Sequence, residues 1–348
     1  MITMKDIARE AKVSIQTVSN VINNRDSQIS EKTRKIILEL VEKFDYKPSR
    51  IARSLRYGIT KTIGLVVPEL IYHPVYAMIF DLIENELNNK GFSILLFNTR
   101  EEILKENEAI ETLLESKVDG IIFIRIIQRN PRLEKLQRSV PLVACLRAFE
   151  YINVPSVLVD NKKVGFLATE YLIKKGHKKI IHIEGNKDLL AHRERKLGYI
   201  EALKKHKLNI DEKYIISGDY KKKGLYKELS KKIARLKDYS AIFAYNDIVA
   251  VNCIKALGNL GYRVPKDISI IGVDNLEIGN FVEPSLTTIE QPIEEVCSLT
   301  VELLIDLINN KDKYENNYNK VIICNPKLII RDSVMSLLKK FTVEGNKI

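Results

Sequence analysis

The 348-residue sequence contains no tryptophan, four cysteines and five histidines. Cys145, Cys253, Cys297 and Cys324 are widely separated and form no CxxC pair, which argues against a zinc site or a disulfide framework. The histidines also lack metal-ligand spacing, and His182 lies in an apolar segment typical of a satisfied interior residue. We therefore expect neither a metal ion nor another cofactor.

Long apolar runs are absent as well. No stretch approaches the roughly 18 apolar residues of a membrane span, and the N-terminus lacks the apolar core of a signal peptide. The sequence therefore predicts a cytoplasmic protein without membrane attachment. A hydrophobic content of 45% and a charged content of 29% are ordinary for a folded chain, and the length predicts more than one domain.

Glycine-rich nucleotide-binding motifs are missing. The 15 glycines contain no G-x-G, so the dinucleotide-binding fingerprint is absent. Neither the phosphate loop G-x-x-x-x-G-K-[ST] nor the nucleophile elbow G-x-S-x-G occurs. We therefore expect that the protein is not an enzyme.

The net charge of +11 is concentrated at one end of the chain. Residues 1–60 hold 12 Lys/Arg and 7 Asp/Glu, a net charge of +5 in a sixth of the chain. A basic end segment is typical of a polyanion-binding module. The alternative is a lysine-rich composition throughout, as in the Lys-Lys-Lys run at 221–223.

The first 47 residues predict three helices. Thr3, Ser14 and Ser30 are each placed to cap the start of a helix, and Asp6 gives the first a capping-box pattern. The second helix is expected to run through Asn23. The third is expected to end at Pro48 and to turn inward the side chains of Ile36, Ile37, Leu40, Val41 and Phe44.

Residues 4–23 have the spacing of a helix-turn-helix. The second helix is expected to bury Val18, Val21 and Ile22 and to expose Ile15, Gln16, Thr17, Ser19 and Asn20. Gln and Asn can pair with adenine in the major groove, and Ile15 can contact a thymine methyl. The alternative is a small helical bundle with a polar outer face.

A short helix is expected between Ser49, its cap, and Gly58, its end. About nine residues are too few for a stable isolated helix in water, so this segment should order only with a partner.

From residue 61 the pattern alternates between apolar runs and amphipathic segments, which is typical of parallel sheets covered by helices. The expected strands are 63–67, 94–97, 120–124, 142–145, 157–159, 180–183, 214–216, 241–244 and 268–273. The expected helices lie near 75–89, 103–116, 163–175, 194–205, 222–236, 247–260 and 294–309. So many strands predict two α/β subdomains, with a boundary at Asp160–Lys162.

Several motifs together resemble the lactose/galactose repressor (LacI/GalR) family of bacterial regulators. They are Lys5–Ala8, Val13–Asn23, Thr33–Arg34, Tyr46–Leu55, Thr62–Pro68, Val118–Gly120, Gly176–His177, Asn246–Asp247, Val264–Asn275, Leu286–Pro292 and Leu328–Val334. They occur in the family's order over almost the whole chain. Lys12 departs from the pattern, because the family often has glycine in that turn, and some strain is expected there.

The resemblance implies a homodimer that binds near-palindromic double-stranded operator DNA. Paired hinge helices would enter the minor groove, where Ala52 and Leu55 match the wedge positions and Arg50, Arg53 and Arg56 can reach phosphates. The alternative is that Leu55 packs on the core. The full set of expected DNA contacts is Thr3, Ser14, Ile15, Gln16, Thr17, Ser19, Asn20, Asn23, Arg50, Ala52, Arg53, Leu55 and Arg56.

The resemblance also implies a core like that of periplasmic sugar-binding proteins. The expected organisation is a headpiece at 1–47, a hinge at 48–60, a first lobe at 61–160 with 292–322, a second lobe at 161–291 with 323–338, and a tail at 339–348.

An effector is expected between the two lobes, where ligands enter open α/β sheets. The matching positions are Tyr76, Arg195, Tyr220, Asn246 and Asp274. Arg125 could add a contact that favours a sugar phosphate or acid. The alternatives are a helix N-cap for Asp274 and a surface salt bridge for Arg195.

The resulting hypothesis is a DNA-binding regulator, a repressor of carbohydrate-use genes, that answers a sugar or sugar phosphate. The alternatives are a regulator that answers a nucleobase or a partner protein, and a sugar-binding protein without DNA affinity. A periplasmic protein of the last kind would need a signal peptide and would have no basic three-helix segment.

Overall fold

The computed structural model describes residues 2–22, 29–46, 59–70, 73–125, 130–147, 152–218, 223–310 and 319–338. The chain forms two compact units, Met1–Thr60 and Lys61–Ile348. The helix expected at 49–58 and the tail from 339 lie outside the described residues. No helix in the described ranges is both long and apolar enough to cross a membrane.

The N-terminal unit contains α1 (Met4–Glu10), α2 (Ile15–Ile22) and α3 (Glu31–Lys43). The three predicted caps are confirmed. The backbone N–H groups of Asp6, Thr17 and Thr33 donate to the hydroxyls of Thr3, Ser14 and Ser30 over 3.4, 3.0 and 3.2 Å. The Asp6 carboxylate accepts from the Thr3 N–H in return, which completes the capping box.

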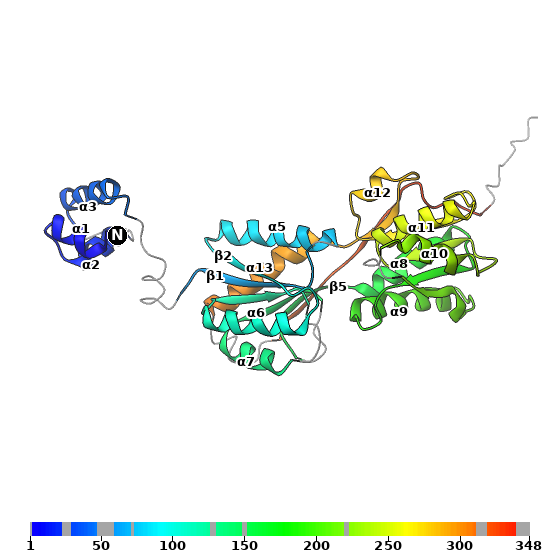
Figure 1. Cartoon of the computed structure of the whole chain (residues 1–348), viewed down its shortest axis with the longest axis horizontal. Coiled ribbons are helices and arrows are strands. Elements are labelled where there is room, and N and C mark those ends of the chain that lie inside the picture. Colours follow the sequence, from blue (N-terminus) through cyan, green and yellow to red (C-terminus); the bar gives the residue numbers. More distant parts are fainter. Residues whose placement is uncertain are drawn as a thin grey trace, which may run out of the picture. The chain divides into compact units, whose positions relative to one another are not determined.

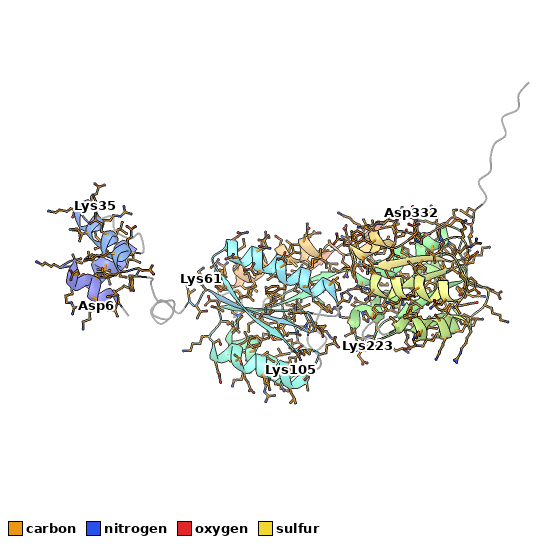
Figure 2. The ribbon with its side chains drawn as sticks, turned by 45° about the horizontal axis from the view of Figure 1, so that its top comes forward. Asp6, Lys35, Lys61, Lys105, Lys223 and Asp332 are labelled. Atoms are coloured by element: carbon orange, nitrogen blue, oxygen red, sulfur yellow. The ribbon has the colours of Figure 1, made fainter. Side chains whose placement is uncertain are left out.

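A small apolar core joins these helices through Ile7, Ala8, Val18, Val21 and Ile37. The turn before α2 places Lys12 at φ +54°, in the left-handed region that the comparison with glycine led us to expect. Charged side chains such as that of Lys35 project away from α3 (Figure 2).

Two expectations for the third helix were wrong. Ile36 is 39% exposed, because neighbouring residues on a helix point about 100° apart and Ile37 takes the inward position. The helix ends at Lys43 rather than Pro48, since Asp45 adopts φ +44° and the Tyr46 N–H bonds back to the Val41 carbonyl.

The larger unit contains two six-stranded sheets, each the centre of one lobe. The first sheet is wholly parallel, in the order β11-β5-β4-β3-β1-β2. Its strands are β1 (Thr62–Val67), β2 (Ser93–Asn98), β3 (Gly120–Phe123), β4 (Leu142–Leu146), β5 (Ser156–Val159) and β11 (Val321–Cys324). One face packs against α5 (Pro74–Asn89) and α13 (Ile293–Asn309), the other against α6 (Ile103–Glu115) and α7 (Pro131–Ser139) (Figure 1).

The second sheet has the order β12-β10-β9-β8-β6-β7, and only β12 runs antiparallel. Its strands are β6 (Ile180–Glu184), β7 (Ile215–Ser217), β8 (Ala241–Ala244), β9 (Ser269–Val273), β10 (Thr287–Glu290) and β12 (Lys327–Ile329). Helices α8 (Asn161–Lys174) and α9 (Leu190–Lys205) cover one face, and α10 (Leu225–Ile233) and α11 (Asp247–Asn259) cover the other (Figure 1). Two short elements complete this lobe, η1 (Glu212–Tyr214) and α12 (Ile278–Phe281).

The chain passes between the lobes three times, after β5, after β10 and between β11 and β12. Three connections at one place are typical of lobes that can change their relative angle. The expectations missed β10, β11, β12, α7 and α12. Edge strand β11 was missed although its sequence, Val-Ile-Ile-Cys, is a continuous apolar run, and in the structure Val321 and Ile323 are more than half exposed.

Candidate functional site

A cavity lies where the carboxyl ends of parallel strands from both sheets meet. The space there, counted together with its opening to solvent, is about 430 Å³. Its lining is mostly polar and consists of His73, Val75, Tyr76, Glu101, Leu146, Arg147, Leu189, His192, Arg195, Tyr245, Asn246, Asp274 and Gln291.

Strand ends supply most of the polar groups, as expected for open parallel sheets. Glu101 follows β2, Arg147 follows β4, Asn246 follows β8, Asp274 follows β9 and Gln291 follows β10. Residues from both lobes therefore face a single cavity.

Asn246 and Asp274 form the polar side of the cavity in the second lobe. Asn246 caps α11, accepting from the Val249 N–H over 2.9 Å, and its amide nitrogen donates to Nε2 of His73 over 3.0 Å. Asp274 accepts from the Gln291 amide through Oδ1. It does not cap a helix, because α12 begins only at Ile278 with Glu277 at its N-cap.

Arg195 is buried, with 4% of its surface exposed, so it does not make a surface salt bridge. Its Nε donates to Asn161 Oδ1 over 3.0 Å, and its Nη1 donates to the Tyr245 carbonyl over 2.5 Å. Burial lowers the pKa of the guanidinium, and the Asp274 carboxylate partly offsets that effect.

Two glycines allow Arg195 to reach this position. A Cβ on Gly165 would lie 1.9 Å from the Arg195 carbonyl oxygen, and a Cβ on Gly198 would lie 2.0 Å from the Lys162 carbonyl oxygen. Only glycine permits such a close approach of two helix backbones, so α8 and α9 pack in contact at this point.

Three residues that line the cavity have a left-handed backbone conformation. Glu101, Leu146 and Asp274 adopt φ values of +57°, +71° and +114°. Left-handed conformations are costly for residues with a Cβ, and they persist where the surrounding structure holds a functional geometry. These three conformations make the cavity a candidate functional site.

The imidazoles of His192, which is buried, and His73, which is half-buried, line the cavity. Burial lowers the pKa of His73, with Asp274 opposing the effect, and lowers the pKa of His192 further below its usual value. Neutral imidazole can both donate and accept a hydrogen bond, which suits a ligand with hydroxyl or ring-nitrogen groups.

The structure brings together Tyr76, Arg195, Asn246 and Asp274 of the expected effector set. Arg125 is placed differently from the expectation. It does not line the cavity, and its Nη1 lies 2.5 Å from Oε1 of Glu101, which does. Tyr220 lies outside the described residues.

Four polar residues of the lining were not predicted from the sequence: His73, Arg147, His192 and Gln291. Arg147 lies two residues after the predicted strand 142–145, so a search for polar residues near strand ends would have found it. Gln291 follows β10, a strand that was not predicted. His73 directly precedes α5, and His192 lies in the first turn of α9. Neither directly follows a strand, so no pattern in the sequence marked them as lining residues.

In the N-terminal unit, α2 presents a polar outer surface. Ile15 is 48% exposed, Gln16 is exposed, and Asn20 is partly exposed. The Gln16 amide donates to Asn20 Oδ1 over 2.8 Å, which holds the two amides together on the outer face. The second helix of a helix-turn-helix reads bases with such a face.

The other residues expected to contact DNA differ in their exposure. Ser19 was expected to be exposed but is only 3% exposed, because a short hydroxyl side chain can pack between helices. Thr3 and Ser14 are exposed while capping their helices, and Thr17 is partly exposed. Asn23, Arg50, Ala52, Arg53, Leu55 and Arg56 lie outside the described residues.

Comparisons with known proteins agree with this arrangement. Residues 3–49 match the pattern of bacterial regulatory proteins of the lacI family, and residues 169–334 match a periplasmic binding protein-like domain. The chain is 33% identical to the HTH-type transcriptional repressor PurR of Aliivibrio fischeri, over 97% of this chain and all of that protein.

Two solved structures are similar over long stretches. The transcriptional regulator CelR in complex with cellobiose has a TM-score of 0.71 and 28% identity, covering 96% of this chain and all of that one. A LacI-type regulator from Alkaliphilus metalliredigens, complexed with D-xylulofuranose, has a TM-score of 0.68 and 33% identity, covering 79% of this chain and all of that one. The chain therefore belongs to the LacI family of DNA-binding transcriptional repressors, which are regulators and not enzymes.

Proposed function

We propose that this repressor is controlled by a small polyhydroxylated effector, a sugar or sugar phosphate, that binds in the cavity of the larger unit. One observation carries the proposal. Oδ2 of Asp274 is buried and has no hydrogen-bond donor within the described residues, although it faces the cavity beside the Asn246 and Gln291 amides. A buried carboxylate oxygen without a donor is costly, and a ligand hydroxyl supplies that donor.

The rest of the lining supports the same ligand class. Amides, imidazoles and a carboxylate offer donors and acceptors in alternation, which suits several neighbouring hydroxyls. Tyr76 offers an aromatic ring to the apolar face of a sugar, as sugar-binding sites commonly do. The regulators bound to cellobiose and to D-xylulofuranose are further support for a carbohydrate.

A nucleobase is the second candidate effector. The relatives of 33% identity that span nearly the whole chain are repressors named PurR. Amide and carboxylate side chains can bond the edge of a base, and Tyr76 and Tyr245 can stack on its face.

The proposed mechanism couples the cavity to DNA through the lobes. An effector shifts operator affinity only if it binds one lobe arrangement more tightly than the other. We propose that this change orders or releases the hinge at 48–60 in a homodimer on a near-palindromic operator. Exposed α2 residues such as Gln16 and Asn20 would read bases, and Leu55 would wedge into the minor groove.

The test starts with the operator. Selection from random duplex DNA with the full-length protein identifies a binding site, which we expect to be near-palindromic. Operator affinity is then measured by fluorescence anisotropy with sugars, sugar phosphates and free nucleobases. A shift of about 5-fold or more caused by a sugar or sugar phosphate supports the first candidate. A shift caused only by a nucleobase supports the second.

A further inference from the structure

Arg147 differs from the other charged residues of the cavity. It follows the last residue of β4, and its guanidinium lies above the Tyr76 ring, with Cζ 5.9 Å from the ring centroid. Its Nη1 is buried without a hydrogen-bond partner, and no ion pair forms at Arg147 within the part of the chain that the structure describes.

The other charges of the cavity have partners on the protein. Glu101 pairs with Arg125 at 2.5 Å. Asp274 accepts from Gln291 and lies 3.4 Å from His73, and Arg195 donates to Asn161 and to a carbonyl. Arg147 therefore brings a positive charge to the cavity that no described carboxylate pairs with.

The surroundings of His192 show the same imbalance. Burial is the main cause of its lowered pKa, and the charged groups that lower it further are Arg147, Arg195 and Arg125. Among the largest contributions, only the hydrogen bond to the Asn186 carbonyl acts in the opposite direction. Three arginines therefore bring positive charge close to this imidazole.

We propose that the effector carries an anionic group, a phosphate or a carboxylate, and that Arg147 binds this group while Asp274 binds hydroxyls. The proposal rests on the proposed function of the cavity. A neutral hydroxyl can satisfy one N–H of Arg147 but leaves its charge uncompensated, whereas a phosphate or carboxylate matches the fork of a guanidinium and neutralises it.

The experiment uses the full chain and the simplest anions. Inorganic phosphate and acetate are titrated separately by calorimetry at constant ionic strength against a chloride background. The variants are Arg147→Gln, which removes the charge, and Arg147→Lys, which keeps it. The matched control is Arg263→Gln, because Arg263 is exposed and pairs with Asp267 at 3.2 Å outside the cavity.

We expect wild type and Arg263→Gln to bind at least one anion with equal Kd, and Arg147→Gln to bind it at least about tenfold more weakly. Arg147→Lys should fall between them, because it keeps the charge and loses the fork. Phosphate binding without acetate binding identifies a phosphate effector, and the reverse identifies an acid. If Arg147→Gln does not fold, the Kd values of Arg147→Lys and Arg263→Gln are compared instead. Weaker anion binding by Arg147→Lys then supports the inference, and equal binding contradicts it.

Two results overturn the inference. One is that neither anion binds wild type at concentrations up to about 20 mM. The other is that Arg147→Gln and wild type bind the anion with equal Kd. Operator titrations separate this outcome from failure of the proposed function. If a neutral sugar or nucleobase shifts operator affinity equally in wild type and Arg147→Gln, the cavity is an effector site and the anion inference is wrong. If anions bind through Arg147 but no compound shifts operator affinity, Arg147 forms an anion site, and both the proposed function and the assignment of that anion to an effector are wrong.

Discussion

The imidazole Nε2 of His73 lies 3.4 Å from Oδ2 of Asp274, and the two residues belong to different lobes. His73 precedes α5 of the first lobe, whereas Asp274 follows β9 of the second. The same nitrogen accepts from the Asn246 amide over 3.0 Å. When His73 is neutral this nitrogen has no proton for Asp274, so a ligand hydroxyl can take that place.

His73→Ala should loosen the arrangement of the lobes in the effector-free protein. The variant loses a hydrogen bond between lobes that contributes about 1 kcal/mol, which shifts a two-state equilibrium about fivefold. Small-angle scattering should show a larger radius of gyration for the variant than for a His206→Ala control. His206 is a suitable control because it contacts Glu170 within the second lobe. Identical scattering of His73→Ala and wild type would show that the contact does not hold the lobes.

Gly165→Ala should destabilise the second lobe and displace Arg195. The new Cβ would lie 1.9 Å from a backbone oxygen of α9, so the helices must separate, at a cost of about 1–3 kcal/mol. Gly258→Ala in α11 is the matched control, because a Cβ at that position would have nothing within 4 Å, and alanine there should stabilise by up to about 1 kcal/mol. Equal urea midpoints for the two variants would refute the close packing.

His182 should make the protein less stable in acid. It is fully buried between the rings of Tyr199 and Phe243, and burial lowers its pKa to about 4. As the pH falls below 6.5, His182 becomes protonated in the unfolded chain but stays neutral in the folded protein. Its contribution to the free energy of unfolding is therefore fully present above pH 6.5 and is lost as the pH falls toward 4.

His182→Phe keeps the aromatic packing and removes the titration. Between about pH 7.5 and 4.5 the free energy of unfolding of wild type should fall relative to that of the variant by up to about 3 kcal/mol. A difference between the two proteins that is independent of pH would mean that His182 is not held neutral by the fold.

Asp247 should make the protein less stable as the pH rises, the opposite of the effect of His182. It is buried and accepts from Thr288 Oγ1 and from the Leu276 N–H, and burial together with the nearby Asp274 charge raises its pKa to about 8. The folded protein therefore binds a proton that the unfolded chain releases near pH 4, so stability is lost as the pH rises toward 8.

Asp247→Asn removes this dependence. From about pH 6 to pH 8.5 the free energy of unfolding of wild type should fall relative to that of the variant by up to about 3 kcal/mol. Parallel curves for the two proteins over this range would place the pKa of Asp247 near its usual value.

Gln16→Ala should relax the choice of bases in the operator. Gln16 is exposed on α2 and bonds Asn20, so the two amides form one reading surface. We expect a loss of about 1–3 kcal/mol at one base pair of each half-site and almost no change on random DNA. An equal loss on every sequence would make Gln16 a backbone contact.

Local signals in the sequence predicted more than distant ones. Thr3, Ser14 and Ser30 were recognised as caps because capping depends on residues three positions apart. Ser19 was misplaced because its burial depends on packing between helices. Gln291 was missed because β10 is a short strand with two threonines, and its sheet position depends on partners far away in the chain. Arg125 has the expected charge, but only the structure shows that Glu101 pairs with it.

The central claim is that occupation of the cavity controls DNA binding. The direct test measures operator affinity with and without a saturating concentration of the effector from the screen, in wild type and in Asp274→Asn, with melting curves to check folding. We predict a change of about 5–150-fold in wild type, which corresponds to about 1–3 kcal/mol. The variant should keep the effector-free affinity and lose the change. A full response by a folded Asp274→Asn variant would contradict the account.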